Sequence, residues 1–509
     1  MTRLLAVGAI GGFLGVMAGC GGSHNAARTT CVGSGNGCTR SLQAAIDAAH
    51  DGDTIKVGRG EFAGGITIAK SVRIMGAGAG RSIVRGGGPV MTVARGSGGA
   101  STVSIVGLTI TGGVTRTDPA RTCGADVPSC GPGYLRATAL GGGIEIAPRA
   151  TVTIRDSVVA RNRATPTVTV PSVSADCPSG PCAFAQGGGG GIDNWGRLTL
   201  QDTAVRDNQA GGGVTAQADG GGVLNEAGSR LTLESSTVEG NRVVVRKPNA
   251  RFAAGGGIFL GEGGTLSMHR STVGRNRADL TAAMPASVDV NAQSAGILLA
   301  AGSRATIRDS AISSNAVTGT NSDGAGTFCR GGLGVDDNSS VVLSGSTISH
   351  NRVSATARAT PREPGAFLAC AGALDLFPDT VRITKTRIVG NSVRARTSSG
   401  TALAVAGAIS AVAANGTRIA DSLISRNRAS AVSARGSAMV YAGGLHNGHV
   451  TRLRRVTVSR NVASAHGRKT LTRGGGIYNG LVPGLDFPVK LDIAHSVVAH
   501  NRPDQCYGC

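Results

Sequence analysis

The chain alternates between segments of fixed length and segments of variable length. Ten times, a step of glycine or alanine leads into an apolar residue, and in nine of these units an asparagine follows 16 to 18 positions later. In the unit that opens at Gly257-Ile258, the apolar residues fall in three short runs, 258–260, 265–268 and 271–273. Such short alternating runs predict three β-strands per unit that share one interior.

Each unit is predicted to be one rung of a solenoid. Strands of three or four residues cannot be stable alone, so each must pair with its equivalent in the neighbouring unit, which gives a parallel β-helix. Asparagine tolerates the backbone of a sharp bend, and stacked amides can hydrogen-bond from rung to rung. We therefore expect one structural ladder, formed by Asn162, Asn208, Asn241, Asn276, Asn315, Asn351, Asn391, Asn427, Asn461 and Asn501.

The predicted solenoid spans residues 41–509 and has about 12 rungs. Residues 41–50 are expected to form a capping helix, because Ser41 can cap it and Leu42, Ala45, Ile46 and Ala49 share one face. Irregular rungs follow over 54–113, and regular rungs run over 141–501. The expected fold class is all-β.

The N-terminus has the features of an export signal. Arg3 precedes a short apolar run, residues 4–16, that is too short to span a membrane. Met17-Ala18-Gly19-Cys20 resembles a bacterial lipobox, which implies that residues 1–19 are a lipoprotein signal peptide and that Cys20 is lipidated. Residues 20–40 are then a flexible tether, and the protein is exported and anchored to the cell envelope through lipid. The alternative is an ordinary cleavable signal.

The ten other cysteines form an even set, which is typical of an oxidising compartment. Cys329 and Cys370 precede the small-residue steps of successive units, so stacking of the rungs would bring them together. Metal binding is the competing interpretation, but no histidines stand near the pairs, and no metal is expected. The predicted disulfides are Cys31–Cys38, Cys123–Cys130, Cys177–Cys182, Cys329–Cys370 and Cys506–Cys509.

The repeats at 189–208 and 220–241 read Gly-Gly-Gly, an apolar residue, any residue and Asn, then a Leu-Thr-Leu strand and a closing asparagine. They resemble the right-handed β-helix proteins of the pectin-lyase-like fold, including the polymorphic outer-membrane-protein type of repeat. Residues 41–55 are similar to the opening segment of that fold. The resemblance covers 41–509 and implies a single-stranded right-handed parallel β-helix, but this fold carries many functions.

Two groups of acids are the catalytic candidates. Glu145 and Asp193 occupy the same place in adjacent units, and Asp336 and Asp337 lie one rung from Asp375. Rungs stack about 4.8 Å apart, and glycoside hydrolysis uses two carboxylates about 5–9.5 Å apart. Solvated surface acids are the alternative interpretation. By resemblance, lyases of this fold use acidic calcium ligands, so calcium is expected only for a lyase, and otherwise no cofactor.

Two other catalytic arrangements do not assemble. Asp336-Asp337 is similar to the paired aspartates of polygalacturonases, but the nearest candidate for the histidine motif, 465–467, lies three rungs beyond. His446 and His449 flank Asn447-Gly448 in a predicted turn, without the glycine-flanked serine of a hydrolase elbow.

The net charge of +21 would attract anionic polymers. Nucleic acid is not an expected partner, because aromatic residues for base stacking make up only 3% of the chain. An arginine follows the closing asparagine in several units, which predicts a basic stripe or, alternatively, solvated turn residues. These arginines are Arg163, Arg242, Arg277, Arg352, Arg428 and Arg502.

The sequence favours the first of two functions and keeps the second as the alternative. The first is a lipid-anchored cell-surface protein whose variable segments, such as 115–140 and 165–186, bind or adhere to glycans or other anionic components of the envelope. The second is a carbohydrate-active enzyme, a polysaccharide lyase or glycoside hydrolase, on an acidic polysaccharide. The sequence details a scaffold, and it allows catalysis without requiring it.

Overall fold

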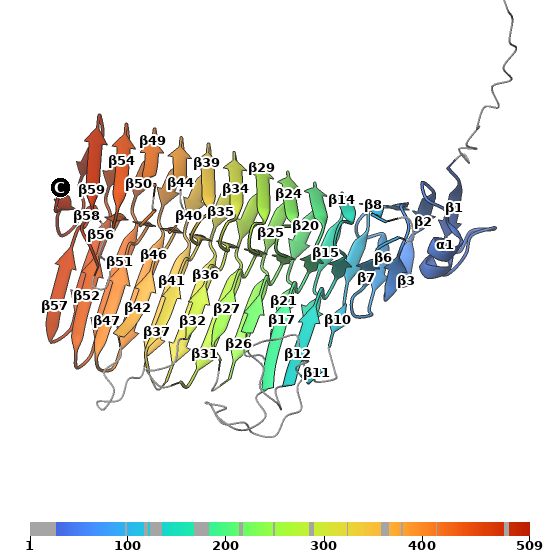
Figure 1. Ribbon diagram of the computed structural model, residues 1–509, viewed down its shortest axis with the longest axis horizontal. Coiled ribbons are helices and arrows are strands. Elements are labelled where there is room, and N and C mark those ends of the chain that lie inside the picture. The colour runs from blue at the N-terminus through green and yellow to red at the C-terminus, as the bar shows by residue number, and fades with distance from the viewer. Residues whose placement is uncertain are drawn as a thin grey trace, which may run out of the picture.

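The computed structural model shows a parallel β-helix (Figure 1). Strands stack along one axis from the end that carries helix α1 to the end that carries β59, near the C-terminus. The structure describes residues 27–96, 99–116, 121–122, 135–166, 183–212, 217–247, 250–284, 290–322, 324–357, 366–377, 380–413, 415–482 and 488–509.

The strands form five sheets, which the chain visits in the same order on each regular turn. We number the sheets in that order, starting from the sheet that follows the small-residue step. The three predicted strands of each unit lie in sheets 1, 2 and 3. The prediction of three strands per turn is wrong, because the variable segment after each asparagine adds strands in sheets 4 and 5.

Sheet 1 contains β4 (Ile66–Ile68), β7 (Met91–Val93), β13 (Ile144–Ile146), β18 (Ile192–Asn194), β23 (Val223–Asn225), β28 (Ile258–Leu260), β33 (Ile297–Leu299), β38 (Leu333–Val335), β43 (Leu374–Leu376), β48 (Ile409–Ala411), β53 (Leu445–Asn447), β58 (Ile477–Asn479) and β61 (Cys506–Tyr507). Sheet 2 contains β1 (Thr29–Val32), β2 (Thr54–Val57), β5 (Arg73–Gly76), β8 (Thr102–Val106), β14 (Thr151–Arg155), β19 (Arg197–Gln201), β24 (Arg230–Glu234), β29 (Thr265–His269), β34 (Arg304–Arg308), β39 (Ser340–Ser344), β44 (Thr380–Thr384), β49 (Thr417–Ala420), β54 (Val450–Arg454) and β59 (Lys490–Ala494). Sheet 3 contains β3 (Gly60–Ala63), β6 (Ser82–Arg85), β9 (Thr109–Thr111), β15 (Val158–Ala160), β20 (Ala204–Arg206), β25 (Thr237–Glu239), β30 (Thr272–Gly274), β35 (Ala311–Ser313), β40 (Thr347–Ser349), β45 (Arg387–Val389), β50 (Leu423–Ser425), β55 (Thr457–Ser459) and β60 (Val497–Ala499).

Sheet 4 contains β10 (Val114–Thr115), β16 (Arg163–Ala164), β21 (Gln209–Ala210), β26 (Arg242–Arg246), β31 (Arg277–Ala282), β36 (Ala316–Asn321), β41 (Arg352–Ala357), β46 (Ser392–Thr397), β51 (Arg428–Ser433) and β56 (Val462–His466). Sheet 5 contains β11 (Arg121–Thr122), β12 (Leu135–Leu140), β17 (Ala183–Gly188), β22 (Gln217–Asp219), β27 (Phe252–Ala254), β32 (Asn291–Gln293), β37 (Gly326–Cys329), β42 (Ala366–Cys370), β47 (Thr401–Val405), β52 (Ser437–Tyr441) and β57 (Lys469–Arg473). The pairing of β11 with β12 is antiparallel, unlike the parallel pairing of the other strands.

The N-terminal end is simpler than the rest. The turns before β10 use only sheets 1, 2 and 3. The capping helix is present as α1 (Leu42–Ala48), with the Ser41 hydroxyl accepting a hydrogen bond from the Ala44 amide and with Leu42, Ala45 and Ile46 buried. The predicted tether 20–40 is ordered at its end, because β1 pairs with β2 and so extends sheet 2 by one strand.

The two larger hydrophobic clusters of the described residues hold the turns together. Isoleucine, leucine and valine fill the space inside sheets 1, 2 and 3. A second core between sheets 4 and 5 consists mostly of alanine and valine. Small side chains allow the two sheets to approach closely, so the variable segment forms a thin two-layered extension of each turn.

The asparagine ladder is confirmed. All ten asparagines are buried, and each Nδ2 from Asn162 to Asn461 donates to the Oδ1 of the next asparagine at 2.9–3.1 Å. The backbone amide of each asparagine donates to the same oxygen. The row therefore satisfies buried polar groups and fixes the register of successive turns.

Three predicted disulfides are confirmed, Cys31–Cys38, Cys329–Cys370 and Cys506–Cys509. Cys20 and the pairs Cys123–Cys130 and Cys177–Cys182 lie outside the described residues, as does the predicted signal peptide 1–19. Among the described residues, no helix has the length and apolar character needed to cross a membrane.

Candidate functional site

A corner between sheets 5 and 1 runs along the solenoid and collects its unusual side chains. The middle residue of each sheet 1 strand from β13 to β58 points away from the main core, yet several are buried, because the ends of the sheet 5 strands pack against them. We call these middle residues the corner row. They are Glu145, Asp193, Leu224, Phe259, Leu298, Gly334, Asp375, Ser410, His446 and Tyr478.

Four carboxyl groups gather at the N-terminal end of the corner row. Glu145 and Asp193 are direct register partners, which confirms their predicted adjacency. Asp219, the last residue of β22, and Glu226, in the turn after β23, complete the group. Asp193 is influenced electrostatically by Glu226 and Glu145, and Asp219 by Glu226. We call these four residues the acid cluster.

Asparagine side chains hold the two bends that carry Trp195 and Glu226, which lie on adjacent turns of the solenoid. Asn194 Nδ2 donates to Asn225 Oδ1 at 2.6 Å, and the Gly196 amide donates to Asn194 Oδ1 at 3.1 Å. Trp195 follows Asn194 as Glu226 follows Asn225, so the two side chains start from equivalent places on adjacent turns. The Trp195 indole is 41% exposed, and its Nε1 donates to Asp193 Oδ2 at 2.9 Å.

Burial dominates the titration of the acid cluster. Asp193 is 0% exposed, and desolvation, reinforced by Glu226, raises its pKa well above the usual range. Desolvation raises the pKa of Asp219 to about 7, although Gln217 and Gln186 donate hydrogen bonds that oppose this rise. It raises the pKa of Glu226 to about 6 and also raises that of Glu145. Protonated and ionised carboxyl groups therefore coexist near neutral pH.

The two aspartates of the cluster retain unused hydrogen-bonding capacity. Asp193 Oδ1 and Asp219 Oδ1 are buried and have no hydrogen-bond partner among the described residues. Buried polar oxygens without a partner are uncommon in native proteins, and these two oxygens are free to accept a hydrogen bond from water or a ligand.

The second predicted acid group is organised by Arg330, which the sequence analysis did not identify. Arg330 Nε lies 3.2 Å from Asp375 Oδ2, and Nη1 contacts Asp336 and donates to Gln293 Oε1 at 2.8 Å. Although burial opposes the charge, Asp375 and Asp336 more than offset it, so the pKa of Arg330 is raised. We call Arg330, Asp336, Asp375 and Gln293 the Arg330 network. Asp337 does not join it, because it is exposed in the turn after β38.

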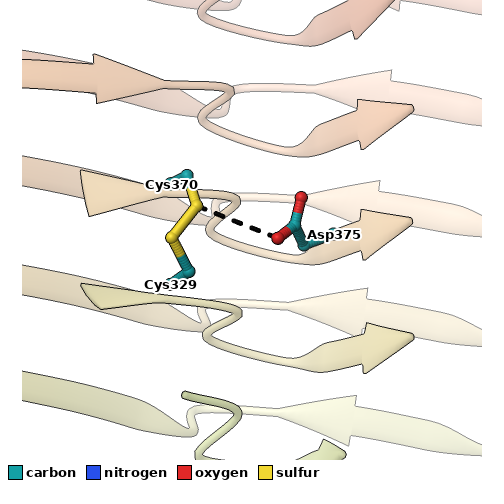
Figure 2. Close-up of side chains that lie close together, drawn as sticks. All are labelled: Cys329, Cys370 and Asp375. Carbon is teal, nitrogen blue, oxygen red and sulfur yellow. Dashed lines mark hydrogen bonds between the residues drawn. A yellow bond between two sulfur atoms is a disulfide. The ribbon is translucent and has the colours of Figure 1, made fainter. Parts of the chain in front are cut away.

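Glycine makes room for this arginine in the corner row. A Cβ atom at Gly334 would lie 2.3 Å from Arg330 Cδ, so any other residue at this position would displace the guanidinium stem. Asp375 Oδ2 also lies 3.8 Å from Cys370 Sγ, which is joined to Cys329 in a disulfide (Figure 2). The network thus fills the centre of the corner with a compensated buried ion pair.

The described residues do not assemble a metal cage. Within the described ranges, the one group that brings three possible ligand atoms within 4.8 Å is Cys329, Cys370 and Asp375. Its two sulfurs are joined in a disulfide and so cannot act as thiolates. Among the described residues, the acid cluster does not bring three possible ligand atoms within 4.8 Å of one another.

The prediction that His446 lies in a turn is wrong. His446 is the middle residue of strand β53 and is 1% exposed, because Tyr478 of the next turn stacks on its ring at 5.7 Å between centroids. Its Nδ1 lies 3.4 Å from Ser410 Oγ, and burial lowers its pKa to about 4. The imidazole is therefore neutral near pH 7 and packs in the aromatic end of the corner row.

Sequence reasoning missed Asp219, Glu226, Trp195 and Arg330. Asp219 precedes its glycine step as Cys329 and Cys370 precede theirs, so the argument that paired the cysteines would have placed Asp219 beside sheet 1. Trp195 is the only tryptophan in the chain, and it directly follows the repeat's Ile-x-Asn segment.

Comparison with known proteins adds little beyond the fold. No family profile matches the chain, and no curated protein matches it. Among solved structures, the chain is similar to the A-module of mannuronan C-5 epimerase AlgE6 from Azotobacter vinelandii, with 13% identity, a TM-score of 0.32 and coverage of 90% of this chain and 93% of that one. It is also similar to the AlgE4 A-module from the same organism, with 14% identity, a TM-score of 0.28 and coverage of 90% and 94%. The five stacked sheets themselves establish the parallel β-helix.

Proposed function

We propose that this β-helix is a carbohydrate-active enzyme whose reaction takes place at the acid cluster. The observation that supports the proposal is the placement of four carboxyl groups with raised pKa values beside the exposed Trp195. Perturbed carboxyl groups concentrate at catalytic sites, and an exposed indole offers an apolar face on which a sugar ring can stack.

Each residue has a distinct role in this proposal. Glu226, with a pKa of about 6, gives its proton to the glycosidic oxygen as the bond to the anomeric carbon breaks. Glu145, the other partly accessible carboxylate, accepts a proton from the water that attacks that carbon, and the hydroxyl left by this water forms the new bond to the anomeric carbon. Asp193 and Asp219 are positioning residues, because Asp193 fixes Trp195 and both keep the cluster desolvated.

The test is a screen of the purified protein against neutral and acidic polysaccharides. New reducing ends indicate hydrolysis, and unsaturated products indicate a lyase. We expect activity that declines as the pH rises above about 6 and that falls by about two orders of magnitude in Glu226→Gln, the usual contribution of a general acid.

Glu262→Gln is the matched control, because Glu262 is an exposed glutamate in the turn of the next rung. A control variant as inactive as Glu226→Gln, or activity that Glu226→Gln leaves intact, would contradict the proposed roles. Absence of activity on the whole panel would favour the alternative of a glycan-binding protein, which Trp195 also supports through binding alone.

Export and lipid anchoring form a separate part of the proposal, supported by the lipobox resemblance at 17–20. Incorporation of labelled fatty acid in a bacterial host should depend on Cys20 and be lost in Cys20→Ser. The segments 115–140 and 165–186, on which adhesive display would depend, lie largely outside the described residues.

A further inference from the structure

The outer face of sheet 4 carries a concentration of arginines. The predicted stripe is present, because Arg163, Arg242, Arg277, Arg352 and Arg428 each begin a strand of this sheet and are exposed. Arg502 continues the line by pairing with Val462. Alternation along the strands adds Arg246, Arg394 and Arg396 to the same face.

The two halves of this face differ in charge compensation. In the N-terminal half, Asp279 lies among Arg242, Arg246 and Arg277 and interacts electrostatically with all three. In the C-terminal half, the strands β36, β41, β46, β51 and β56 contain no Asp or Glu. We call Arg352, Arg394, Arg396 and Arg428 the arginine face. None of the four forms an ion pair with any described carboxylate.

Arg394 is the centre of the arginine face. Its side chain is half-buried, and its Nε is buried without a hydrogen-bond partner in the described part of the chain. Burial lowers its pKa, and the charges of Arg396 and Arg352 add to that effect. Four guanidinium groups held together without an acid repel one another, and an anion would relieve this repulsion.

The geometry of the sheet determines which anion fits. Arg352 and Arg428 both align with Ser392 of β46, so they lie two strands, about 9.6 Å, apart, and Arg394 lies on the strand between them. A sugar residue of an extended polysaccharide has about the length of one strand spacing, so three successive uronates of a chain along the axis can present their carboxylates to Arg352, Arg394 and Arg428. Ser354, Thr356 and Ser430 lie among the arginines and can bond to sugar hydroxyls.

Other polyanions fit this face less well. Its strands contain no Phe, Tyr or Trp within the described ranges of sheet 4, so nucleic acid bases would have no stacking platform. The strands β41, β46 and β51, which carry the arginine face and are described in full, have no exposed large apolar side chain that could enter a lipid layer.

We propose that the arginine face binds a linear acidic polysaccharide along the axis of the solenoid. The binding surface lies on a different sheet from the acid cluster and does not depend on the proposed enzymatic function. It would hold an anionic polymer of the cell envelope, or the distant part of a long polymeric substrate, through paired arginine and carboxylate groups.

The test compares two triple variants with the same loss of charge. The first is Arg352→Gln with Arg394→Gln and Arg396→Gln. The control is Arg382→Gln with Arg418→Gln and Arg452→Gln, because these three exposed arginines are register neighbours on sheet 2. Binding of immobilised polygalacturonate is measured at several salt concentrations, with dextran as the neutral polymer and circular dichroism to verify folding.

We expect the first triple variant to weaken polygalacturonate binding about 10-fold or more and to reduce its salt dependence, whereas the control weakens it less than about 3-fold. Glu226→Gln should bind as the wild type does, which separates this surface from the acid cluster. Equal losses of polygalacturonate binding in the two triple variants would show that only the net charge of the protein matters, and would overturn the proposal. Wild-type binding to dextran, single-stranded DNA or phosphatidylglycerol vesicles that equals the binding to polygalacturonate would also overturn it.

Discussion

The acid cluster and the Arg330 network occupy equivalent places in the same corner of the solenoid, and burial raises the pKa of Asp193 and of Asp375, yet the two sites differ in charge compensation. Asp193 and Asp375 are both middle residues of sheet 1 strands, and both are almost fully buried. Asp375 has a guanidinium beside it, whereas the neighbours of Asp193 are two further carboxyl groups and an indole. The repeat fixes where the two aspartates lie. The residues before the glycine or alanine step decide whether the site is a compensated ion pair or a group of carboxyl groups with raised pKa values.

The largest expected effect is the removal of Arg330. Arg330→Gln leaves Asp375 buried without its cation, and breaking one side of a buried ion pair costs about 3–5 kcal/mol. Urea denaturation should show a lower midpoint for the region around β38 and β43. Adding Asp375→Asn should recover part of the loss, because the uncompensated charge is then absent. A midpoint unchanged by Arg330→Gln would show that the network does not neutralise the corner.

The acid cluster should respond in the opposite direction, and only at higher pH. Between about pH 4 and 7, folded Asp219 holds a proton that the unfolded chain has released, so stability falls as the pH rises through this window. A rise in pKa from 3.8 to about 7 corresponds to roughly 4 kcal/mol. Asp219→Asn should therefore stabilise the protein at pH 8 by up to that amount and have no effect at pH 4.

Asp202→Asn is the control for that measurement, since Asp202 is exposed in the neighbouring turn. Urea titrations at pH 4, 6 and 8 provide the comparison. If Asp219→Asn gave the same change at all three values, the carboxyl group would not titrate as described.

The disulfide beside the Arg330 network should have an intermediate effect. Cys329–Cys370 closes a loop with a sequence separation of 41 residues, and its loss in Cys329→Ser with Cys370→Ser should cost about 2–4 kcal/mol. Cys31→Ser with Cys38→Ser, which opens a separation of 7 residues, should cost less. Denaturation monitored under nonreducing conditions distinguishes the two, and an equal loss would contradict the dependence on loop length.

The smallest effect on stability is expected at Trp195. Trp195→Phe keeps an aromatic ring but removes the Nε1 donor to Asp193, which should cost about 1 kcal/mol. The same loss should raise the pKa of Asp193 further, because this hydrogen bond lowers it. Nuclear magnetic resonance of the labelled carboxyl group reports that pKa. A fall in the pKa would show that the indole does not contact the ionised form.

The sequence predicts the parts of the fold that repeat at constant spacing. The asparagine ladder, the Glu145–Asp193 adjacency and the Cys329–Cys370 disulfide all follow from counting positions from the small-residue step. Sheets 4 and 5 were not predicted, because the segments that form them vary in length. Their interior side chains are mostly alanine and valine, which differ little in hydrophobicity from the residues around them in the sequence. Strand β1 was not predicted, because a single short strand next to glycine and serine shows no periodic pattern of apolar residues.

The candidate site was only partly predictable for the same reason. Glu145 and Asp193 belong to the constant segment, whereas Asp219 ends a strand of the variable segment. Arg330 lies directly before its glycine step and has a positive φ of 69°. This backbone conformation cannot be inferred from an arginine in the sequence. Burial also could not be inferred, since the corner row becomes covered only when sheet 5 packs against sheet 1.

The asparagine row has a direction, and this direction constrains how the protein can change in size. From Asn162 to Asn461, each Nδ2 donates to the asparagine Oδ1 of the following turn, and Gln505 Oε1 is the last acceptor in the row, for Asn501. Each Nδ2 also donates to a backbone carbonyl of the preceding turn. If one complete turn is gained or lost, an asparagine Nδ2 still faces an asparagine Oδ1 where the remaining turns meet. If only part of a turn is gained or lost, both groups are left buried without a hydrogen-bond partner. Variants of this architecture are therefore expected to differ in length by whole turns, each bringing its own pair of corner residues.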